Sequence, residues 1–315
     1  MSERAKPPVV SAVLTVYNKA AFLPDTIRSL RRQAEDEGAI EYIFVDDASD
    51  DESVAIIRDM MADAPSFRII ENTDNRGPSV RLNQGAKAAT GDFLYLLDGD
   101  DIAIQGALRG MLRLLQEQEA DFIYGKTRKK IGEGVDLFDL AIDPDAPFSV
   151  SDRPLQTVLG GGFVRMALMC RRELFIRAGG ADERIFVQDE SLPLRLAANA
   201  GRMIDWQAEV IAQPPPVDGA EKVSRNKSQL HHDAFLAYRH ALDDIGDRFP
   251  DLVPRLYRRA VSAYWKYAKR RPGPSILKSG FWRYLQAKSG QARLRPDVLD
   301  RMQTEFSAHN DIRRM

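Results

Sequence analysis

Four apolar runs at regular intervals constrain the fold of the first hundred residues more strongly than any other feature. The runs occupy residues 9–16, 41–45, 67–70 and 93–97. Each is short, continuous and rich in aliphatic or aromatic residues, which is typical of strands buried on both faces of a sheet. Between the runs, apolar residues recur at helical spacing, as do Leu23, Ile27 and Leu30. This alternation predicts right-handed βαβ units and an α/β fold with a parallel sheet.

Carboxylates follow two of these runs directly. Asp46 and Asp47 come after the second run, and the tetrad Asp98-Gly99-Asp100-Asp101 comes after the fourth. Ligands bind at the carboxyl ends of strands in such sheets, so we expect both groups to share one site. Crowded carboxylates repel one another, and a bound divalent cation such as Mg²⁺ or Mn²⁺ relieves that repulsion. The tetrad therefore predicts a metal–phosphate site; a polar turn is the alternative, because Asp-Gly is common in turns.

The composition is that of a globular protein of one large or two ordinary domains, with 315 residues. No apolar stretch reaches the roughly 18 residues needed to span a bilayer. The short apolar run near the N-terminus ends at residues 17–19 without a cleavage site, so we expect no signal peptide. The single Cys170 allows no internal disulfide, which favours a reducing, cytoplasmic location, and we expect it to be a small buried residue.

Charge is distributed unevenly along the chain. Residues 221–315 contain 20 Lys and Arg against 10 Asp and Glu, whereas the rest contains 25 against 36. The run Pro214-Pro215-Pro216 marks a boundary. We therefore expect one domain over residues 1–220 and a basic helical region over 221–315. Within that region, helical patterns cover about 228–246, 251–270 and 296–308.

Residues 255–285 interleave Lys and Arg with seven Tyr, Trp and Phe residues. This composition suits peripheral contact with an anionic membrane surface. It equally suits a helical bundle that packs its aromatic side chains on the rest of the chain, or on a second subunit in a homodimer. No recognised nucleic-acid-binding module is visible, so we expect no nucleic-acid partner.

Four segments within residues 9–215 occur in an order that identifies a family. They read VSAVLTVYNKAAFLPDTIRSLRRQ, EYIFVDDASDDES, NRGPSVRLNQGAKAATGDFLYLLDGDD and ELFIRAGGADERIFVQDESLPLRLAANAG. In this order and at this spacing they resemble the family 2 glycosyltransferases, whose catalytic domain has the GT-A fold, a Rossmann-like, mostly parallel sheet. The resemblance implies that residues 1–220 form the catalytic domain. It does not cover residues 225–315.

The resemblance places the nucleoside of a nucleotide-diphospho-sugar, expected to be a UDP- or GDP-sugar, at Thr15, Tyr17 and Asn18. Tyr17 would stack on the base; the alternative is a Tyr packed at a strand end. Asp47 would accept the N–H groups of uracil or guanine, with Asp46 supporting it or reaching the ribose. The alternative for this pair is a cap of the following helix.

The resemblance also implies a metal-assisted donor site. It places Asp98, with Gly99, on the ribose side and Asp100 on the divalent metal, Mn²⁺ or Mg²⁺, with Asp101 as a supporting partner. The metal would neutralise the diphosphate leaving group. Arg81 stands one position earlier than the family's usual Arg, so its side chain either reaches a phosphate or the ribose or points elsewhere.

On the acceptor side, the resemblance implies that Asp189 is the general base of an inverting displacement. Gln188 replaces the family's usual Glu, and Glu190 follows at the start of a helix. Asp189 as a cap of that helix is the alternative. Three further assignments complete this side. Gly161 and Gly162 would form the acceptor loop, Arg195 would anchor Asp189 or a phosphate, and His232 would be a late metal ligand, unless it belongs to the polar first turn of a helix.

The sequence thus predicts an inverting glycosyltransferase that acts on a glycan or lipid-linked acceptor in the synthesis of cell-surface polysaccharide, lipopolysaccharide or another glycoconjugate. A non-catalytic module that binds nucleotide sugars or membranes is the alternative. A nucleotidyltransferase would carry a Gly-rich basic loop after its first strand, where this chain reads TVYNKAAF.

Overall fold

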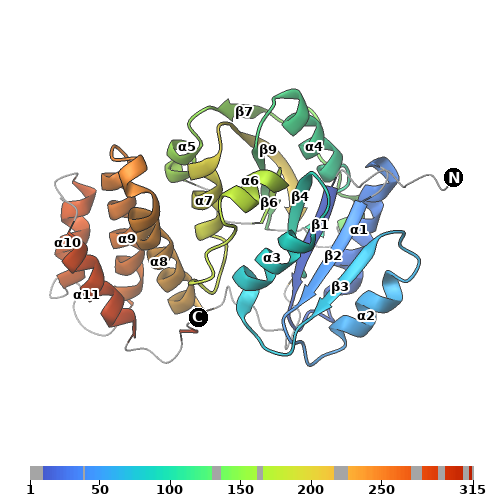
Figure 1. Ribbon diagram of the computed structural model, residues 1–315, viewed down its shortest axis with the longest axis horizontal. Helices are drawn as coiled ribbons and strands as arrows, with labels where there is room; N and C mark the ends of the chain where they lie inside the picture. The colour runs from blue at the N-terminus through green and yellow to red at the C-terminus, as the bar shows by residue number, and fades with distance from the viewer. Residues whose placement is uncertain are drawn as a thin grey trace.

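The structure is a computed structural model that describes residues 10–37, 40–129, 136–161, 166–215, 226–270, 279–289, 295–307 and 312–313. Within them, nine strands form one sheet with helices on both faces (Figure 1). The strands are β1 (Val10–Val16), β2 (Ile40–Asp46), β3 (Phe67–Glu71), β4 (Phe93–Asp98), β5 (Ile102–Ala103), β6 (Phe122–Arg128), β7 (Phe148–Ser151), β8 (Leu168–Arg171) and β9 (Met203–Ala212). We call residues 10–215, which contain all nine strands, the body. Its helices are α1 (Leu23–Glu37), α2 (Ser53–Met60), α3 (Gly77–Ala88), α4 (Ala107–Glu117), α5 (Pro154–Gly160), α6 (Arg172–Arg177) and α7 (Ser191–Asn199). The later helices are α8 (Lys227–Ile245), α9 (Val253–Ala268), α10 (Ser279–Lys288) and α11 (Pro296–Ser307).

The first four strands form the parallel half of the sheet, in the order β3-β2-β1-β4, which confirms the predicted βαβ units. Every residue of β1 and β2 is buried, as continuous apolar runs require. Val16 pairs with Asp46, and Thr15 pairs with Asp98. The carboxyl ends of β1, β2 and β4 therefore meet at one edge, which brings both predicted carboxylate groups together.

Beyond β4 the sheet is mixed. Strand β8 runs antiparallel to both β4 and β6, and β9 runs parallel to β6. Successive side chains of each strand point to opposite faces. On one face, Ala12 and Leu14 pack with α1, α2 and α4, while on the other Val13 packs with α3 and α7. The body is therefore a three-layer α/β/α sandwich.

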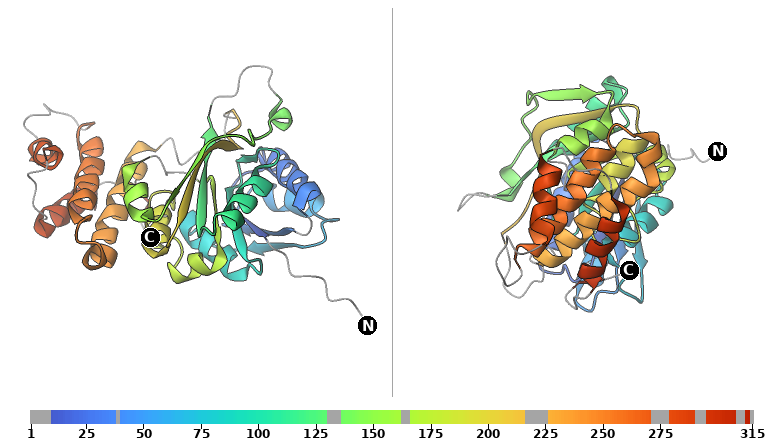
Figure 2. Two further views of the ribbon diagram at one scale, coloured as in Figure 1. Left: turned by 90° about the horizontal axis from the view of Figure 1, so that it is seen from above. Right: turned by 90° about the vertical axis from the view of Figure 1, so that its left-hand side faces the viewer.

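The C-terminal helices extend the layer that contains α5 and α7. Figure 2 shows α8 to α11 beyond α5 and α7 on one side of the sheet, with α1 and α2 on the other side. One continuous apolar core includes Val13 of β1, Leu196 of α7, Phe235 of α8 and Val261 of α9. Of the aromatic residues of α9, Tyr257, Tyr264, Trp265 and Tyr267 are all buried in it. Among the described helices, none combines the length and apolar character needed to cross a bilayer.

Candidate active site

The ends of β1 and β4 are joined by short contacts. The Gly99 N–H donates to the Thr15 carbonyl at 3.0 Å, and the Thr15 hydroxyl lies 3.4 Å from Asp98 Oδ1. The hydroxyl of Thr26 on α1 donates to the Gly99 carbonyl at 3.2 Å. These bonds fix the start of the Asp tetrad against the loop that follows β1.

That loop is clamped to the loop after β2. Asn18 has a φ of 51°, in the left-handed region that Asn tolerates. Its N–H donates to Ser49 Oγ, and its side-chain Oδ1 accepts from the Asp50 N–H, both at 3.0 Å. The Lys19 N–H donates to Ser53 Oγ at 2.8 Å. Tyr17 stays 36% exposed beside this clamp, which leaves its ring accessible.

Asp46 and Asp47 are equally buried but differ in their hydrogen bonds. Asp47 Oδ1 accepts from the Arg76 N–H at 2.8 Å and from Arg81 Nε at 2.6 Å, and Asp47 Oδ2 accepts from the Gly77 N–H at 2.7 Å. Asp46 Oδ2 accepts from the Ser49 N–H at 3.1 Å. Asp46 Oδ1 is buried and has no hydrogen-bond partner among the described residues.

Arg81 lies in the interior and is held by carboxylates. Besides Asp47, its guanidinium contacts the carbonyl and carboxylate of Asp74. Its side chain is only 4% exposed. The structure therefore places Arg81 as the partner that fixes Asp47 at the start of α3, and none of these contacts joins it to the tetrad.

The tetrad places three carboxylates within four residues, so their negative charges repel one another. Burial and the nearby charge of Asp100 raise the pKa of Asp98 to about 6, although Lys19, Thr15 and Gln188 act in the opposite direction. Lys19 Nζ pairs with Asp100 Oδ2 at 2.9 Å, so this ammonium neutralises part of the negative charge of the tetrad. Sequence reasoning did not single out Lys19. Lys19 comes close to the tetrad because the loop after β1 lies against the end of β4.

Carboxylate oxygens crowded at a strand end fit a hard divalent cation. Among the described residues, no three His, Cys, Asp or Glu side chains are grouped as a complete cation site. An ion at Asp100 would take further oxygen ligands, and the phosphate oxygens of a bound ligand would suit it. The donor set therefore fits a metal that arrives with a phosphate-bearing ligand.

The segment before α7 connects to the tetrad. Gln188 Nε2 donates to Asp98 Oδ1 at 3.2 Å, and the Gln188 carbonyl accepts from the N–H groups of Ser191 and Leu192 at the start of α7. A Glu at this position would add a second carboxylate beside Asp98, whereas the amide supplies a donor. Asp189 follows immediately, so the expected base lies next to the side chain that contacts the donor-side carboxylate.

Two tyrosines lie close to residues 189–190, and neither was identified from the sequence. Tyr238 of α8 donates to Glu190 Oε2 at 3.1 Å. Burial raises the pKa of Glu190, and the Tyr238 hydrogen bond and the charges of Lys266 and Arg259 act against this. Burial also raises the pKa of Tyr124, and so does the charge of Asp189 nearby. The helical region thus contributes directly to the surroundings of residues 189–190.

The remaining acceptor-side predictions that the structure describes lie at the end of α5, on α7 and on α8. Gly161 ends α5 with a φ of 128°, a conformation that favours Gly, while Gly162 lies outside the described residues. The His232 ring contacts Asp233 at 2.8 Å and lies edge-on to Phe306. Asp233 also accepts from the Val187 N–H at 2.9 Å, two residues before Asp189. The expected role of His232 as a metal ligand stays a prediction.

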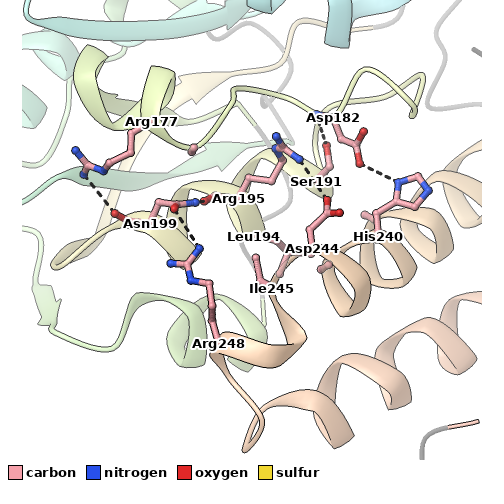
Figure 3. Close-up of a pocket in the computed structure, with 13 residues that line it drawn as sticks. Arg177, Asp182, Ser191, Leu194, Arg195, Asn199, His240, Asp244, Ile245 and Arg248 are labelled. Atoms are coloured by element: carbon pink, nitrogen blue, oxygen red, sulfur yellow. Dashed lines mark hydrogen bonds and ion pairs between the residues drawn. The ribbon is translucent and has the colours of Figure 1, made fainter. Parts of the chain in front are cut away.

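Arg195 points to a cavity of about 270 Å³ between α7 and α8 (Figure 3). Its Nε donates to the Gly180 carbonyl at 2.8 Å, and its Nη1 lies 3.6 Å from Asp244. None of these contacts is with Asp189. The cavity walls also hold the Asp182–His240 pair and the contacts of Arg248 with Asn199. Arg195 therefore contributes to the junction of the body with α8.

Comparison with known proteins identifies the family. The family model described as "Glycosyl transferase family 2" matches residues 11–176, more than half of the chain. The chain belongs to glycosyl transferase family 2. The poly(ribitol-phosphate) beta-glucosyltransferase of Bacillus spizizenii is 31% identical over 127 residues, which cover 40% of this chain and 20% of that protein. The matches of this family 2 chain span about half or less of the length of its curated relatives.

Solved structures share the fold. Residues 1–349 of Staphylococcus aureus TarS align with a TM-score of 0.62 at 14% identity, covering 95% of this chain and 91% of that one. The mannosyltransferase PcManGT of Pyrobaculum calidifontis, solved with GDP-Man and Mn²⁺, aligns with a TM-score of 0.57 at 18% identity, covering 96% and 86%. At these identities the likeness shows the fold alone. The expected GT-A fold with a helical C-terminal region is confirmed.

Proposed function

We propose that this chain catalyses the inverting transfer of a sugar from a nucleotide-diphospho-sugar to an acceptor hydroxyl in the synthesis of a surface glycan. The observation that carries the proposal is the 3.2 Å hydrogen bond from Gln188 to Asp98. It joins the donor-side carboxylate of β4 to the segment that holds Asp189. A displacement needs the donor and the acceptor on adjoining sides of one site, and this contact supplies such an arrangement.

The donor assignment has two supports. The TarS fragment has been solved with UDP-GlcNAc and PcManGT with GDP-Man and Mn²⁺, so nucleotide sugars and a metal occupy this fold in other proteins. In this chain, Asp46 offers a buried oxygen with no partner among the described residues, and it pairs with Val16, the residue before Tyr17. We propose that Asp46, rather than the expected Asp47, accepts the N–H of the base while Tyr17 stacks on it. Thr15, Gly99 and Asp98 would border the ribose.

The chemistry assigned to the chain is a single displacement. Asp189 accepts the proton of the acceptor hydroxyl as its oxygen bonds to the anomeric carbon. The bond from that carbon to the diphosphate breaks on the opposite face, so the configuration inverts. A divalent cation held by Asp100 would neutralise the leaving diphosphate. Lys19 keeps Asp100 oriented until donor binding, and Gln188 steadies Asp98 in its charged form.

The same proposal covers the organisation and location of the chain. Residues 1–220 form the catalytic domain, and residues 221–315 form a helical region that completes its acceptor side through Tyr238. We propose a cytoplasmic protein that acts on a glycan or lipid-linked acceptor. Peripheral membrane contact through residues 255–285 would involve Trp282 and Leu285, which are exposed on α10. In a homodimer, these same two side chains would contact a second copy of the chain.

The test measures nucleotide binding and turnover separately. We expect UDP or GDP with Mn²⁺ to raise the melting temperature, because a ligand that binds only the folded state stabilises it. Asp100→Ala should remove the Mn²⁺-dependent part of the shift. Asp189→Asn should retain the nucleotide shift but abolish release of nucleoside diphosphate from the sugar nucleotide. Asp92→Asn, an exposed carboxylate just before β4, is the matched control. Full turnover by Asp189→Asn would refute Asp189 as the base. Nucleotide binding without turnover by the wild type would favour a non-catalytic module, and no nucleotide shift at all would refute the donor site.

A further inference from the structure

Helix α9 and the turn after it carry a one-sided set of basic side chains. The buried residues of α9 include Leu256, Tyr257, Ala260, Val261, Ala263, Tyr264, Trp265, Tyr267 and Ala268. Six cations of residues 253–270 lie outside that core: Arg258, and five that we call the basic arc, namely Arg255, Arg259, Lys266, Lys269 and Arg270. With 3.6 residues per turn, the spacings between Arg255, Arg259, Lys266 and Arg270 align these side chains along one face. From position 252 to 296 the sequence contains 12 Lys and Arg and no Asp or Glu.

The first end of the basic arc lies against the end of α5. Arg259 Nη2 donates to the Leu159 carbonyl at 2.8 Å. A Cβ built on Gly161 would lie 3.4 Å from Arg259 Nη2, and one built on Gly160 would lie 3.7 Å from Arg255 Nη2. These two guanidinium groups therefore lie beside Gly160 and Gly161, and the sequence predicts Gly161 on the acceptor side.

The arc continues past the proposed base. The charges of Arg259 and Lys266 act on Glu190, the neighbour of Asp189. Further along, burial and the charges of Arg270, Lys266, Lys227 and Lys269 lower the pKa of His231 to about 4. The Nε2 atom of His231 is buried and has no hydrogen-bond partner among the described residues. A row of positive charge thus leads from α5, beside residues 189–190, to the start of α8.

These five cations form no ion pair within the part of the chain that the structure describes. Glu190 is the carboxylate whose pKa responds to the arc. From Arg255 to Arg270 the arc is about 22 Å long at 1.5 Å per residue. A single phosphate would contact one end of it, whereas a chain with repeated phosphates could contact its whole length.

We infer that the basic arc binds the phosphate groups of the acceptor, and that the acceptor class is a phosphodiester-linked polyol or sugar chain. This inference rests on the proposed function, because it assigns the side of Asp189 to the acceptor. The arc would hold the phosphates while a hydroxyl of the same chain reaches Asp189. Lys266 and Arg270 are positioning residues in this assignment, since they hold the acceptor and do not touch the reacting atoms.

A membrane surface fits the arc less well than a flexible chain does. Membrane-bound basic helices place aromatic side chains beside their cations. Here Tyr257, Tyr264, Trp265 and Tyr267 of the same helix are buried in the core. Two of the cations, Arg255 and Arg259, are half-buried beside α5, where a flat surface would not reach them.

The experiment uses inorganic polyphosphate as the probe, in the full chain. Binding of labelled polyphosphate is compared between the wild type, Lys266→Gln/Arg270→Gln and a control, Lys87→Gln/Lys288→Gln. All four substituted side chains are exposed, and the control removes the same charge from the last turns of α3 and α10. We expect the arc variant to bind about tenfold more weakly and the control to bind like the wild type. Added salt should weaken binding by the wild type more than binding by the arc variant.

Two further measurements separate the outcomes. The melting-temperature shift with UDP or GDP and Mn²⁺ reports the donor site, and we expect the arc variant to retain it. Equal losses in both variants, or no loss in either, would overturn the inference while leaving the proposed transfer intact. Binding to phosphatidylglycerol vesicles, lost in the arc variant, without binding to polyphosphate would assign the arc to a membrane and also overturn it. Polyphosphate binding with no nucleotide shift would refute the proposed function instead.

Discussion

Asp46 and Asp47 are adjacent, equally buried carboxylates whose oxygens have different hydrogen-bond partners. Asp47 accepts three hydrogen bonds from the start of α3 and from Arg81. Asp46 Oδ1 is buried with no partner among the described residues, although leaving a buried oxygen unpaired costs about 1–3 kcal/mol. A cost of this kind is tolerated where a ligand later supplies the donor, as the imide N–H of uracil or guanine would.

Substituting each carboxylate by its amide should therefore give opposite results. We expect Asp46→Asn to leave the free energy of unfolding almost unchanged and to weaken UDP or GDP binding about 10- to 100-fold, because a charge-assisted hydrogen bond is lost. Asp47→Asn should lower the free energy of unfolding by about 2–3 kcal/mol, because an amide nitrogen would face backbone N–H donors. Urea unfolding and isothermal titration calorimetry measure the two quantities.

Each variant is the control for the other, since the substitution and the burial are the same. The assignment of the base to Asp46 fails if Asp46→Asn binds both nucleotides as tightly as the wild type. The sequence could predict that the two carboxylates lie at the site, because they follow a buried strand. It could not predict which oxygen stays unpaired, because the donors come from Arg76, Gly77 and Arg81, about 30 residues later in the chain.

At the scale of elements, α3 depends on its first residue. Gly77 has a φ of 80°, and a Cβ there would lie 2.7 Å from the ring of Phe186. Its N–H donates to Asp47, so the turn at which α3 begins also holds the residue that follows β2. Phe186 lies two residues before Gln188, which contacts Asp98, so this turn is linked to the proposed acceptor side. A side chain at position 77 would therefore disturb both halves of the site.

We expect Gly77→Ala to lower the free energy of unfolding by about 2–4 kcal/mol, from the left-handed backbone and the overlap with Phe186 together. Gly201→Ala is the control: its φ is not positive, and the nearest atom, Asp121 Oδ2, would lie 3.6 Å from the added Cβ. That control should change stability by less than about 1 kcal/mol. Thermal unfolding followed by circular dichroism measures both. Equal stability of the two variants would contradict the strain assigned to Gly77.

The elements differ in how well the sequence predicts them. The parallel strands β1 to β4 are continuous apolar runs with helices between them, so their type and order follow from the pattern. Strand β9 was not predicted. Its residues around Trp206 alternate between buried and exposed, and the run is interrupted by Asp205, Gln207 and Glu209. The short strands β5 and β7 pair with residues of β9 that lie more than 50 positions later in the sequence. Such pairing cannot be predicted from local strand propensity.

At the scale of the whole molecule, the C-terminal helices are part of the same packed structure as the sheet. Their apolar residues continue the core that begins at β1. Polar contacts reinforce this junction at Asp182, in the loop before α7. His240 of α8 lies 2.8 Å from Asp182 Oδ2, and Arg184 donates to both Asp182 oxygens at 2.8 Å. Although burial opposes it, these hydrogen bonds hold the pKa of Asp182 well below its usual range.

This junction predicts a pH-dependent loss of stability. We expect Asp182→Asn to lower the free energy of unfolding by about 2 kcal/mol at pH 7, because charge-assisted hydrogen bonds in a buried setting are lost. Asp244→Asn, on the same face of α8, should cost about 0.5 kcal/mol or less, since Asp244 is 38% exposed and water screens its ion pairs. Urea unfolding of the wild type and both variants between pH 7 and pH 3 measures these differences.

The sign of the pH dependence follows from the two states of Asp182. Its pKa is lower in the folded protein than in the unfolded chain, where it is 3.8, so the folded state favours the ionised form. The added stability is fully present above the unfolded pKa, begins to fall below about pH 4, and is lost completely only below the much lower folded pKa. The difference in stability between the wild type and Asp182→Asn should therefore become smaller between pH 5 and pH 3. If the two free energies of unfolding differ by the same amount from pH 7 to pH 3, the charge of Asp182 does not hold α8 to the sheet. The packing of its side chain would then be responsible.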